Sequence, residues 1–372
     1  MEIIKVDLAN REWVKRFIVF PFELYRRSPY WVPPLWDEME KNLDPRRHPF
    51  YEHSQADFFL ALESGKVVGR IGVQENRRHN HFRKAKDAIF CFFDSIDDER
   101  VSQALFEAIF DWAKQRGLER MIGPKGLLGS QAGGVLVEGF ERLPALSMPY
   151  NYPYYDRLIK AAGFEKDTDH LSGYVRADHQ FPERILRIAE KVKEKRGFRV
   201  KNFNSKEEMK AWIPIVARVH AQAFAQNYSF VPPTEKELQM IAHSIIRIAD
   251  PPLVKVVMKN EKVIGFLISY HDISRGLQKA KGRIFPIGWF WLWLEKRRTK
   301  WLNVNGAGLL PEYWGSGANV ILYTELQKAV RQYPFEHVEV VQVDEKNLAS
   351  KSDMEAIGVT WYKRHRNYWR ML

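Results

Sequence analysis

Three short sequence patterns occur twice in this chain, in the same order and at almost the same spacing. The paired positions are Val32 and Val231, Lys66 and Lys262, and Gly163 and Gly358. The members of the three pairs lie 199, 196 and 195 residues apart (231 minus 32, 262 minus 66 and 358 minus 163). Repeats of this length indicate two domains of similar fold, because a solenoid repeats every 20 to 50 residues or so.

Each half of the 372-residue chain carries the pattern of a sheet flanked by helices. In the first half, strand-like runs at 58–63 and 67–73 precede an amphipathic helix over 99–116. We therefore expect the α/β class, with a mixed α+β sheet in each of two tandem domains. The expected boundaries are 1–178 for the first domain, 179–197 for a linker helix and 198–372 for the second domain.

Composition narrows the class of protein. The net charge of +12 favours an anionic partner, and coenzyme A, an acidic lipid headgroup and a nucleic acid all meet this condition. We do not expect a nucleic-acid partner, because no helix pattern carries a strong basic run. The single cysteine, Cys91, excludes an internal disulfide and, together with the lack of a signal peptide, indicates the cytoplasm. No run approaches the ~20 apolar residues of a membrane span, and no Cys/His cluster indicates a metal.

The stretch from Asn305 to Val330 predicts an anion site in the second half. It has the pattern of a strand, a turn with Gly315 and Gly317, and a helix with apolar residues at helical spacing. Glycines let the backbone approach a phosphate closely, and the start of the helix offers unpaired N–H groups. The corresponding turn of the first half, residues 94–99, holds three Asp and one Glu, which repel a diphosphate. The phosphate site therefore belongs to the second half.

The order Leu-Pro-Glu-Tyr-Trp-Gly-Ser-Gly-Ala over residues 310–318 resembles the coenzyme A loop of the GNAT superfamily of N-acetyltransferases. Gly317 matches the central glycine of that loop, whereas Trp314 stands where Arg or Gln is usual and Asn319 where Gly or Ala is usual. The resemblance implies an acetyl-CoA or longer acyl-CoA donor and no metal. The coenzyme-binding residues that it implies are Leu309, Leu310, Trp314, Gly315, Ser316, Gly317, Ala318, Asn319 and Asn347.

The resemblance also implies a catalytic tyrosine, which this chain lacks. Met354 stands at that position, four residues before Gly358, and methionine has no proton to give to a thiolate. A thiol with a pKa of about 8.5 can leave without an acid, so the site either transfers an acyl group or only binds the coenzyme. The candidates for a general base are Glu312, Asp344 and Glu345, of which we select Glu312 and Glu345; the alternative is that they are solvated carboxylates.

An aromatic insert lies between residues 283 and 300. It has three tryptophans within five residues, followed by four cations. Three interpretations remain open: a peripheral membrane contact through 285–300, a lid in which Trp289 and Trp291 line the substrate pocket, and ordinary burial.

Short motifs along nearly the whole chain resemble a group of bacterial two-domain GNAT proteins called YghO-like, a neighbourhood that includes bacterial ceramide synthases. They include residues 31–34, 134–140, 150–155 and 345–347. This implies an N-acyltransferase that acts on an amine, small or lipid-like. The expected acceptor-binding residues of the first half are Tyr150, Asn151, Tyr154 and Tyr155, near a glycine-rich loop at 123–134. The alternative is a non-catalytic protein that binds acyl-CoA or anionic lipid.

Overall fold

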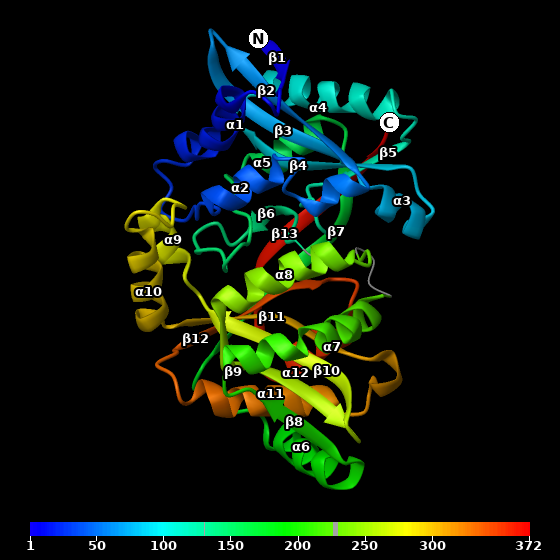
Figure 1. The fold of residues 1–372 in the computed structure, drawn as a ribbon, viewed down its shortest axis with the longest axis vertical. Coiled ribbons are helices and arrows are strands. Elements are labelled where there is room, and N and C mark those ends of the chain that lie inside the picture. The colour runs from blue at the N-terminus through cyan, green and yellow to red at the C-terminus, as the bar shows by residue number, and fades with distance from the viewer. Residues whose placement is uncertain (130, 226–229) are drawn as a thin grey trace. The chain divides into compact units, whose positions relative to one another are not determined.

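A computed structural model describes residues 1–129, 131–225 and 230–372; Ser130 of the glycine-rich loop therefore lies outside the described residues. The chain forms two compact units (Figure 1). Unit 1 contains Met1–His170, Ser274–Leu292 and Lys363–Leu372. Unit 2 contains Leu171–Ile273 and Trp293–Tyr362.

Unit 1 is built around a mixed sheet. Its elements are β1 (Glu2–Lys5), α1 (Arg11–Leu24), α2 (Trp36–Asn42), β2 (Gln55–Glu63), β3 (Lys66–Glu75), α3 (Arg77–Arg83), β4 (Asp87–Ser95), α4 (Glu99–Lys114), β5 (Arg120–Gly123), β6 (Val135–Glu138) and α5 (Tyr155–Ala161). Strands β1 to β4 pair antiparallel in order, and β5 joins β4 in parallel. The amphipathic α4 buries Leu105 and Ile109 in the core, as its apolar spacing predicts.

Unit 2 has the same plan. Its elements are α6 (Glu183–Arg196), β8 (Phe198–Asn202), α7 (Lys206–Phe224), α8 (Glu235–Ile248), β9 (Ala249–Lys259), β10 (Lys262–His271), β11 (Trp301–Leu309), α11 (Ala318–Val330), β12 (His337–Asp344) and α12 (Leu348–Ala356). Its sheet runs β8-β9-β10-β11 antiparallel, with β12 parallel to β11. Figure 1 shows α7 and α8 over these strands. Local chemistry sets the helix starts: Ser205 caps α7, and Thr234 with Glu237 forms a capping box on α8.

Two of the three pairs of positions that repeat in the sequence have equivalent places in the two units. Lys66 opens β3 and Lys262 opens β10. Gly163 and Gly358 follow α5 and α12 with φ of 82° and 91°, in the left-handed region that glycine adopts at little cost. The predicted mixed α/β fold with two similar halves is therefore confirmed.

The units differ from the expected domains in three segments. Residues 274–292, with α9 (Ser274–Ala280) and the start of α10 (Gly288–Arg298), and residues 363–372 belong to unit 1, whereas 171–178 belongs to unit 2. The reason is that β7 (Glu165–Arg176) and β13 (Thr360–Met371) each have residues in both units. The end of β13 pairs with β5 and β6, so the last residues of the chain complete the sheet of unit 1.

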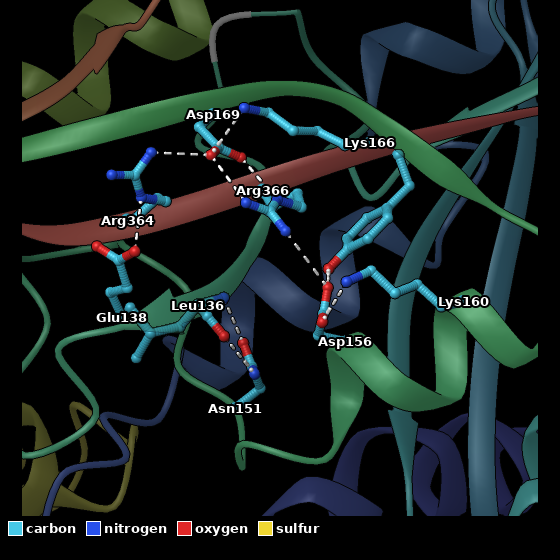
Figure 2. Close-up of polar contacts among 10 residues, drawn as sticks. Leu136, Glu138, Asn151, Asp156, Lys160, Lys166, Asp169, Arg364 and Arg366 are labelled. Carbon is cyan, nitrogen blue, oxygen red and sulfur yellow. Dashed lines mark hydrogen bonds and ion pairs between the residues drawn. The ribbon is translucent and has the colours of Figure 1, made fainter.

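A buried carboxylate fixes the end of β13 within unit 1 (Figure 2). Asp169 is fully buried and accepts from Arg366 at 2.8 and 3.0 Å and from Arg364 at 3.0 Å, while Lys166 lies 3.1 Å away. Burial opposes the charge of Asp169, but the hydrogen bonds from these cations outweigh it and lower its pKa to about 2. Asp156 extends the network to Arg366, 3.7 Å away. The strand is therefore tied to β7 by charge as well as by the sheet.

Candidate functional site

Strands β11 and β12 separate partway along their length. They pair in parallel from Trp301↔His337 to Val304↔Val340, and the pairing ends there. Both strands continue, β11 to Leu309 and β12 to Asp344. The stretch of β11 from residue 305 onward therefore has an open edge on the side of β12.

A bulge in β11 accompanies this separation. Against β10, Ala307 pairs with Leu267 but Val304 pairs with Ser269, so two residues of β11 oppose one of β10. One of the two is Gly306, with φ of 111°. A bulge bends its strand and increases the local twist, which turns β11 away from its parallel neighbour.

Alternation along β11 decides which amides face the open edge. The N–H of Leu310 donates to Ile264 O at 2.8 Å, so it is not available to a ligand. In an antiparallel pair, hydrogen-bonded residues alternate with residues whose N–H points the other way. The N–H groups of Leu309 and Ala307 therefore face the open edge. The carbonyl oxygen of Leu309 accepts from the indole Nε1 of Trp314 at 3.0 Å, and this indole is half-exposed.

The turn after β11 leads into a helix start with free donors. Gly315 and Gly317 have φ of 68° and 81°. The N-cap Gly317 has no side chain to cap α11, although Ser316 Oγ accepts from the N–H of Ala318 at 3.3 Å. Among the described residues none accepts from the N–H of Asn319 or Val320. The guanidinium of Arg196, at the end of α6, donates to Ser316 O at 3.0 Å. Free N–H groups, the positive end of the helix dipole and an adjacent cation together suit a phosphate.

The side chains around α12 complete this region. Asn319 donates to Asp353 at 2.6 Å, and burial raises the pKa of the Asp353 carboxyl. Asn347 caps α12 by accepting from the Ser350 N–H at 3.1 Å. Met354 is buried in an apolar cluster with Val340 and Ile357. Neither Asn319 nor Asn347 is thus a free side chain, whereas the backbone N–H of Asn319 is available.

The two carboxylates selected as bases lie outside the sheet. Glu312 is exposed and pairs with Lys262 at 3.1 Å; the hydrogen bonds from its own backbone N–H and from Lys262 lower its pKa. Glu345 follows the end of β12 and is half-buried.

A third carboxylate lies where the strands separate, and sequence reasoning missed it. Glu339, 1% exposed, is the register partner of Asn303, one residue before the pairing ends. It belongs to a polar strand cluster, defined as Tyr270, Asp272, Asn303, Asn305 and Glu339. Asn305 donates to Tyr270 Oη at 2.8 Å and Asn303 to Asp272 at 3.3 Å. Burial, with smaller effects of Asp272 and Glu339, raises the pKa of Tyr270. The signal was present in the sequence as a charged residue between Val338 and Val340 in a strand.

A neutral histidine lies near the same strands. The ring of His220, on α7, lies 5.7 Å from that of Phe266 and 4.7 Å from that of Phe224. Phe266 pairs with Gly308 of β11. Burial lowers the pKa of His220 to about 4, so the imidazole is uncharged at neutral pH and is a weak base.

The equivalent edge of unit 1 is closed by tyrosines. Pairing of β4 with β5 also stops early, at Ile89↔Ile122, and Ser95 pairs with Gly69 as Leu309 pairs with Gly265. The N–H of Ser95 donates to Tyr155 Oη at 3.3 Å, and its carbonyl accepts from Tyr154 Oη at 2.7 Å. The backbone N–H and carbonyl of Ser95, which correspond to those of Leu309, are thus both hydrogen-bonded within unit 1.

The other residues expected to bind the acceptor have these positions. Asn151 is buried and bonds both the N–H and the carbonyl of Leu136, at 2.7 and 3.1 Å (Figure 2). Tyr150 packs against the core of unit 1. Trp289 is 54% exposed, whereas Trp291 is half-buried beneath the ammonium of Lys279.

The described residues contain neither a candidate metal site nor a helix that could span a membrane. In the part of the chain that the structure describes, no group of three or more His, Cys, Asp or Glu residues could hold a metal ion. Among the helices of the described ranges, none is both long and apolar enough to cross a bilayer.

Relatives of the chain match it over almost its full length. No protein-family model matches it. It is 29% identical to protein YghO of Escherichia coli over 368 residues, which cover 96% of this chain and 93% of YghO. It is 27% identical to the bacterial ceramide synthase of Caulobacter vibrioides over 369 residues, which cover 96% and 95% of the two chains.

Solved structures share the fold along the whole chain. A tandem GNAT protein from the clavulanic acid biosynthesis pathway matches with a TM-score of 0.58 at 12% identity, over 100% of this chain and 98% of that one. A GCN5-related N-acetyltransferase from Anabaena variabilis matches with a TM-score of 0.54 at 11% identity, over 100% of this chain and 73% of that one. The early end of the β11–β12 pairing and the likeness to these proteins lead to one identification: the chain has the tandem GNAT fold and is a homologue of YghO and of the bacterial ceramide synthase.

Proposed function

We propose that the protein is an acyl-CoA-dependent N-acyltransferase with one coenzyme site, in unit 2. The observation that carries the proposal is the open edge of β11, where pairing with β12 ends at Val304 and leaves the N–H groups of Ala307 and Leu309 without a partner among the described residues. This edge runs into a glycine turn and the uncapped start of α11. Amide donors followed by a helix N-terminus fit a molecule with an amide-bearing arm and a diphosphate.

The residues of the chain have separate tasks in this proposal. Acyl-CoA, when bound, supplies an acyl group activated as a thioester. The N–H groups of Ala307 and Leu309 orient the arm, and a preorganised N–H is a strong stabiliser of negative charge on an oxygen. The N–H groups of Asn319 and Val320, with Arg196, hold the diphosphate. Trp314, Gly315, Ser316 and Ala318 shape the turn around it.

Glu339 is the base that we assign to the amine. It stands on β12 one residue before the pairing with β11 ends, and its side chain is almost inaccessible to solvent. An amine must lose a proton as it forms an amide bond, and a carboxylate held next to it can accept that proton. Glu312, Glu345 and His220 are the competing bases.

The acceptor that we propose is an amine on a lipid-like molecule. The support comes from the relative that is named a ceramide synthase, which matches 96% of this chain.

Calorimetry with the full chain tests the coenzyme site. Acetyl-CoA and palmitoyl-CoA should each bind at one site per chain, and the tighter of the two reports the length of the acyl group. If neither binds, the proposal is wrong.

Binding without catalysis is the second candidate, and the buried Met354 favours it because no acid stands at that position. Release of free thiol from acyl-CoA in the presence of a panel of amines separates the two. Turnover with any amine excludes the binding protein, whereas coenzyme binding without turnover across the panel excludes the enzyme.

A further inference from the structure

The segment that leads into α10 presents large apolar side chains to solvent. Phe285 is 80% exposed and Ile287 is 61% exposed, and both lie just before the helix. Within the helix, Trp289, Phe290 and Trp293 are 54%, 37% and 46% exposed. We call these five residues the aromatic patch.

Helical spacing explains why two of these residues, Trp289 and Trp293, are exposed together. Trp289 and Trp293 are four residues apart, so they lie one above the other on one face of α10. Arg297 continues that face, and its guanidinium lies 4.3 Å from the centre of the Trp293 ring. Trp291 and Leu292, on the other side, are only half-exposed.

The charge around the aromatic patch is positive. Lys296, Arg297 and Arg298 form the last turn of α10, and of these Lys296 lies 3.9 Å from the carboxylate of Asp250. Arg297 and Arg298 are exposed, and neither has an ion pair with a described residue. Isolated exposed apolar side chains need no explanation, but five in nine residues next to such cations do.

We propose that the aromatic patch docks the protein onto the surface of an anionic lipid bilayer. Tryptophan and phenylalanine rings partition to the depth of the lipid headgroups, and arginines at the same level meet the phosphates. Charge complementarity favours this occupant, because the chain has a net charge of +12 and Arg297 and Arg298 are exposed next to the rings. The helix is 11 residues long, so it would lie along the surface and not span the bilayer.

This inference goes beyond acyl transfer and does not depend on it. Membrane binding is measured without substrate, so failure of the docking surface and failure of the enzyme are separate results. A protein that docks but does not turn over acyl-CoA would leave the inference intact.

Vesicle flotation with the full chain tests the surface. The probes are vesicles of phosphatidylcholine alone and of phosphatidylcholine mixed with phosphatidylglycerol. We expect the protein to float with the mixed vesicles, to bind pure phosphatidylcholine weakly, and to lose binding as salt is raised.

Two sets of variants separate the apolar and the charged contributions. The triple variant Phe285→Ser, Ile287→Ser and Trp289→Ser should weaken binding to both vesicle types at least tenfold. Loss of one cation near an anionic surface weakens binding about fivefold. The double variant Arg297→Glu and Arg298→Glu should weaken binding to the mixed vesicles by more than this factor per residue, because each change replaces the cation with an anion. All five side chains are exposed, so the fold should be retained, which circular dichroism checks.

Matched controls lie elsewhere on the surface. Leu348→Ser removes a side chain that is 72% exposed, and Arg26→Glu with Arg27→Glu reverses two cations on unit 1. These variants should float like the unchanged protein. The inference is overturned if the protein does not float with mixed vesicles at low salt or if the patch variants float normally. It is also overturned if the control variants lose as much binding as the patch variants.

Discussion

Gly317 lies directly against Val192, so that an added Cβ would be 2.9 Å from Val192 Cγ2. The glycine stands at the start of α11, and the valine is on α6, the helix that sequence analysis treats as a linker. Lys193 of the same helix pairs with Glu325 of α11 at 2.5 Å. Helix α6 is therefore a wall of the candidate coenzyme site and more than a connection.

The replacement Gly317→Ala should damage coenzyme binding. An alanine at either Gly317 or Gly315 strains the backbone, because both positions have a positive φ. Only at Gly317 must the contact with Val192 also give way. We expect the Kd for coenzyme A to rise at least tenfold in calorimetry. The matched control is Gly315→Ala, with a φ of 68° but nothing within 4 Å of the added Cβ, which should change the Kd less than threefold. Equal effects of the two replacements would contradict the role of the close contact.

Glu339→Gln should abolish most of the activity without affecting coenzyme binding. Gln keeps the volume of the side chain but cannot take a proton, and loss of a general base costs on the order of 10²–10⁴ in rate. We expect kcat to fall by that factor while the Kd for coenzyme A changes less than twofold. Glu312→Gln and Glu345→Gln serve as controls and should keep kcat within about threefold. A large loss in either control would transfer the assignment to that residue.

Much of the fold could be predicted from local patterns. Lys66 and Lys262 both begin a strand, and Gly163 and Gly358 both follow a helix with a positive φ. Such strand starts and turns depend on nearby residues alone, so the sequence repeat predicts them. The division of β7 and β13 between the units could not be predicted in this way. Which sheet a strand such as 363–371 completes depends on pairing with residues far away in sequence, here Arg120 to Gly123.

The candidate site shows the same limit. The glycine turn and the uncapped helix start were visible in the sequence, because both are local. The commitment of the Leu310 N–H to Ile264 was not visible, since it depends on the register between β10 and β11. In the sequence, Tyr154 and Tyr155 have a pattern typical of a binding loop. Their hydrogen bonds to the backbone of Ser95, at the edge of β4, join residues about 60 positions apart and could not be predicted from local patterns.

Asp169→Asn should destabilise the protein in a pH-dependent way. Removing the buried charge leaves Arg364, Arg366 and Lys166 without their shared partner, which typically costs about 3–5 kcal/mol at neutral pH. Because the folded pKa of about 2 lies below the ordinary value, the carboxylate stabilises the folded state fully above pH ~4 and loses this effect as the pH falls toward 2.

Urea unfolding at pH 7 and at pH 3 measures this difference. The gap in unfolding free energy between the unchanged protein and Asp169→Asn should be smaller at pH 3. Asp178→Asn is the control, because Asp178 is exposed and its ion pair is with the neighbouring Arg176, so its urea midpoint should not move. A gap that is the same at both pH values would show that charge on Asp169 is not the cause.

Trp314→Phe should strengthen coenzyme binding. The indole Nε1 of Trp314 donates to the carbonyl oxygen of Leu309, on the edge where an amide of the coenzyme arm would need the same acceptor. In the unchanged protein the coenzyme must displace the indole N–H from this oxygen, so one hydrogen bond replaces another with no net gain in binding free energy. Phenylalanine keeps an aromatic ring and leaves the carbonyl oxygen of Leu309 free to accept from the coenzyme. A hydrogen bond contributes about 1 kcal/mol net, so calorimetry should show a Kd roughly fivefold lower. The comparison is with Trp314→Ala, which removes the ring as well as the donor. If Trp314→Phe binds as the unchanged protein does and Trp314→Ala binds more weakly, the ring contacts the ligand and the indole N–H does not compete with it.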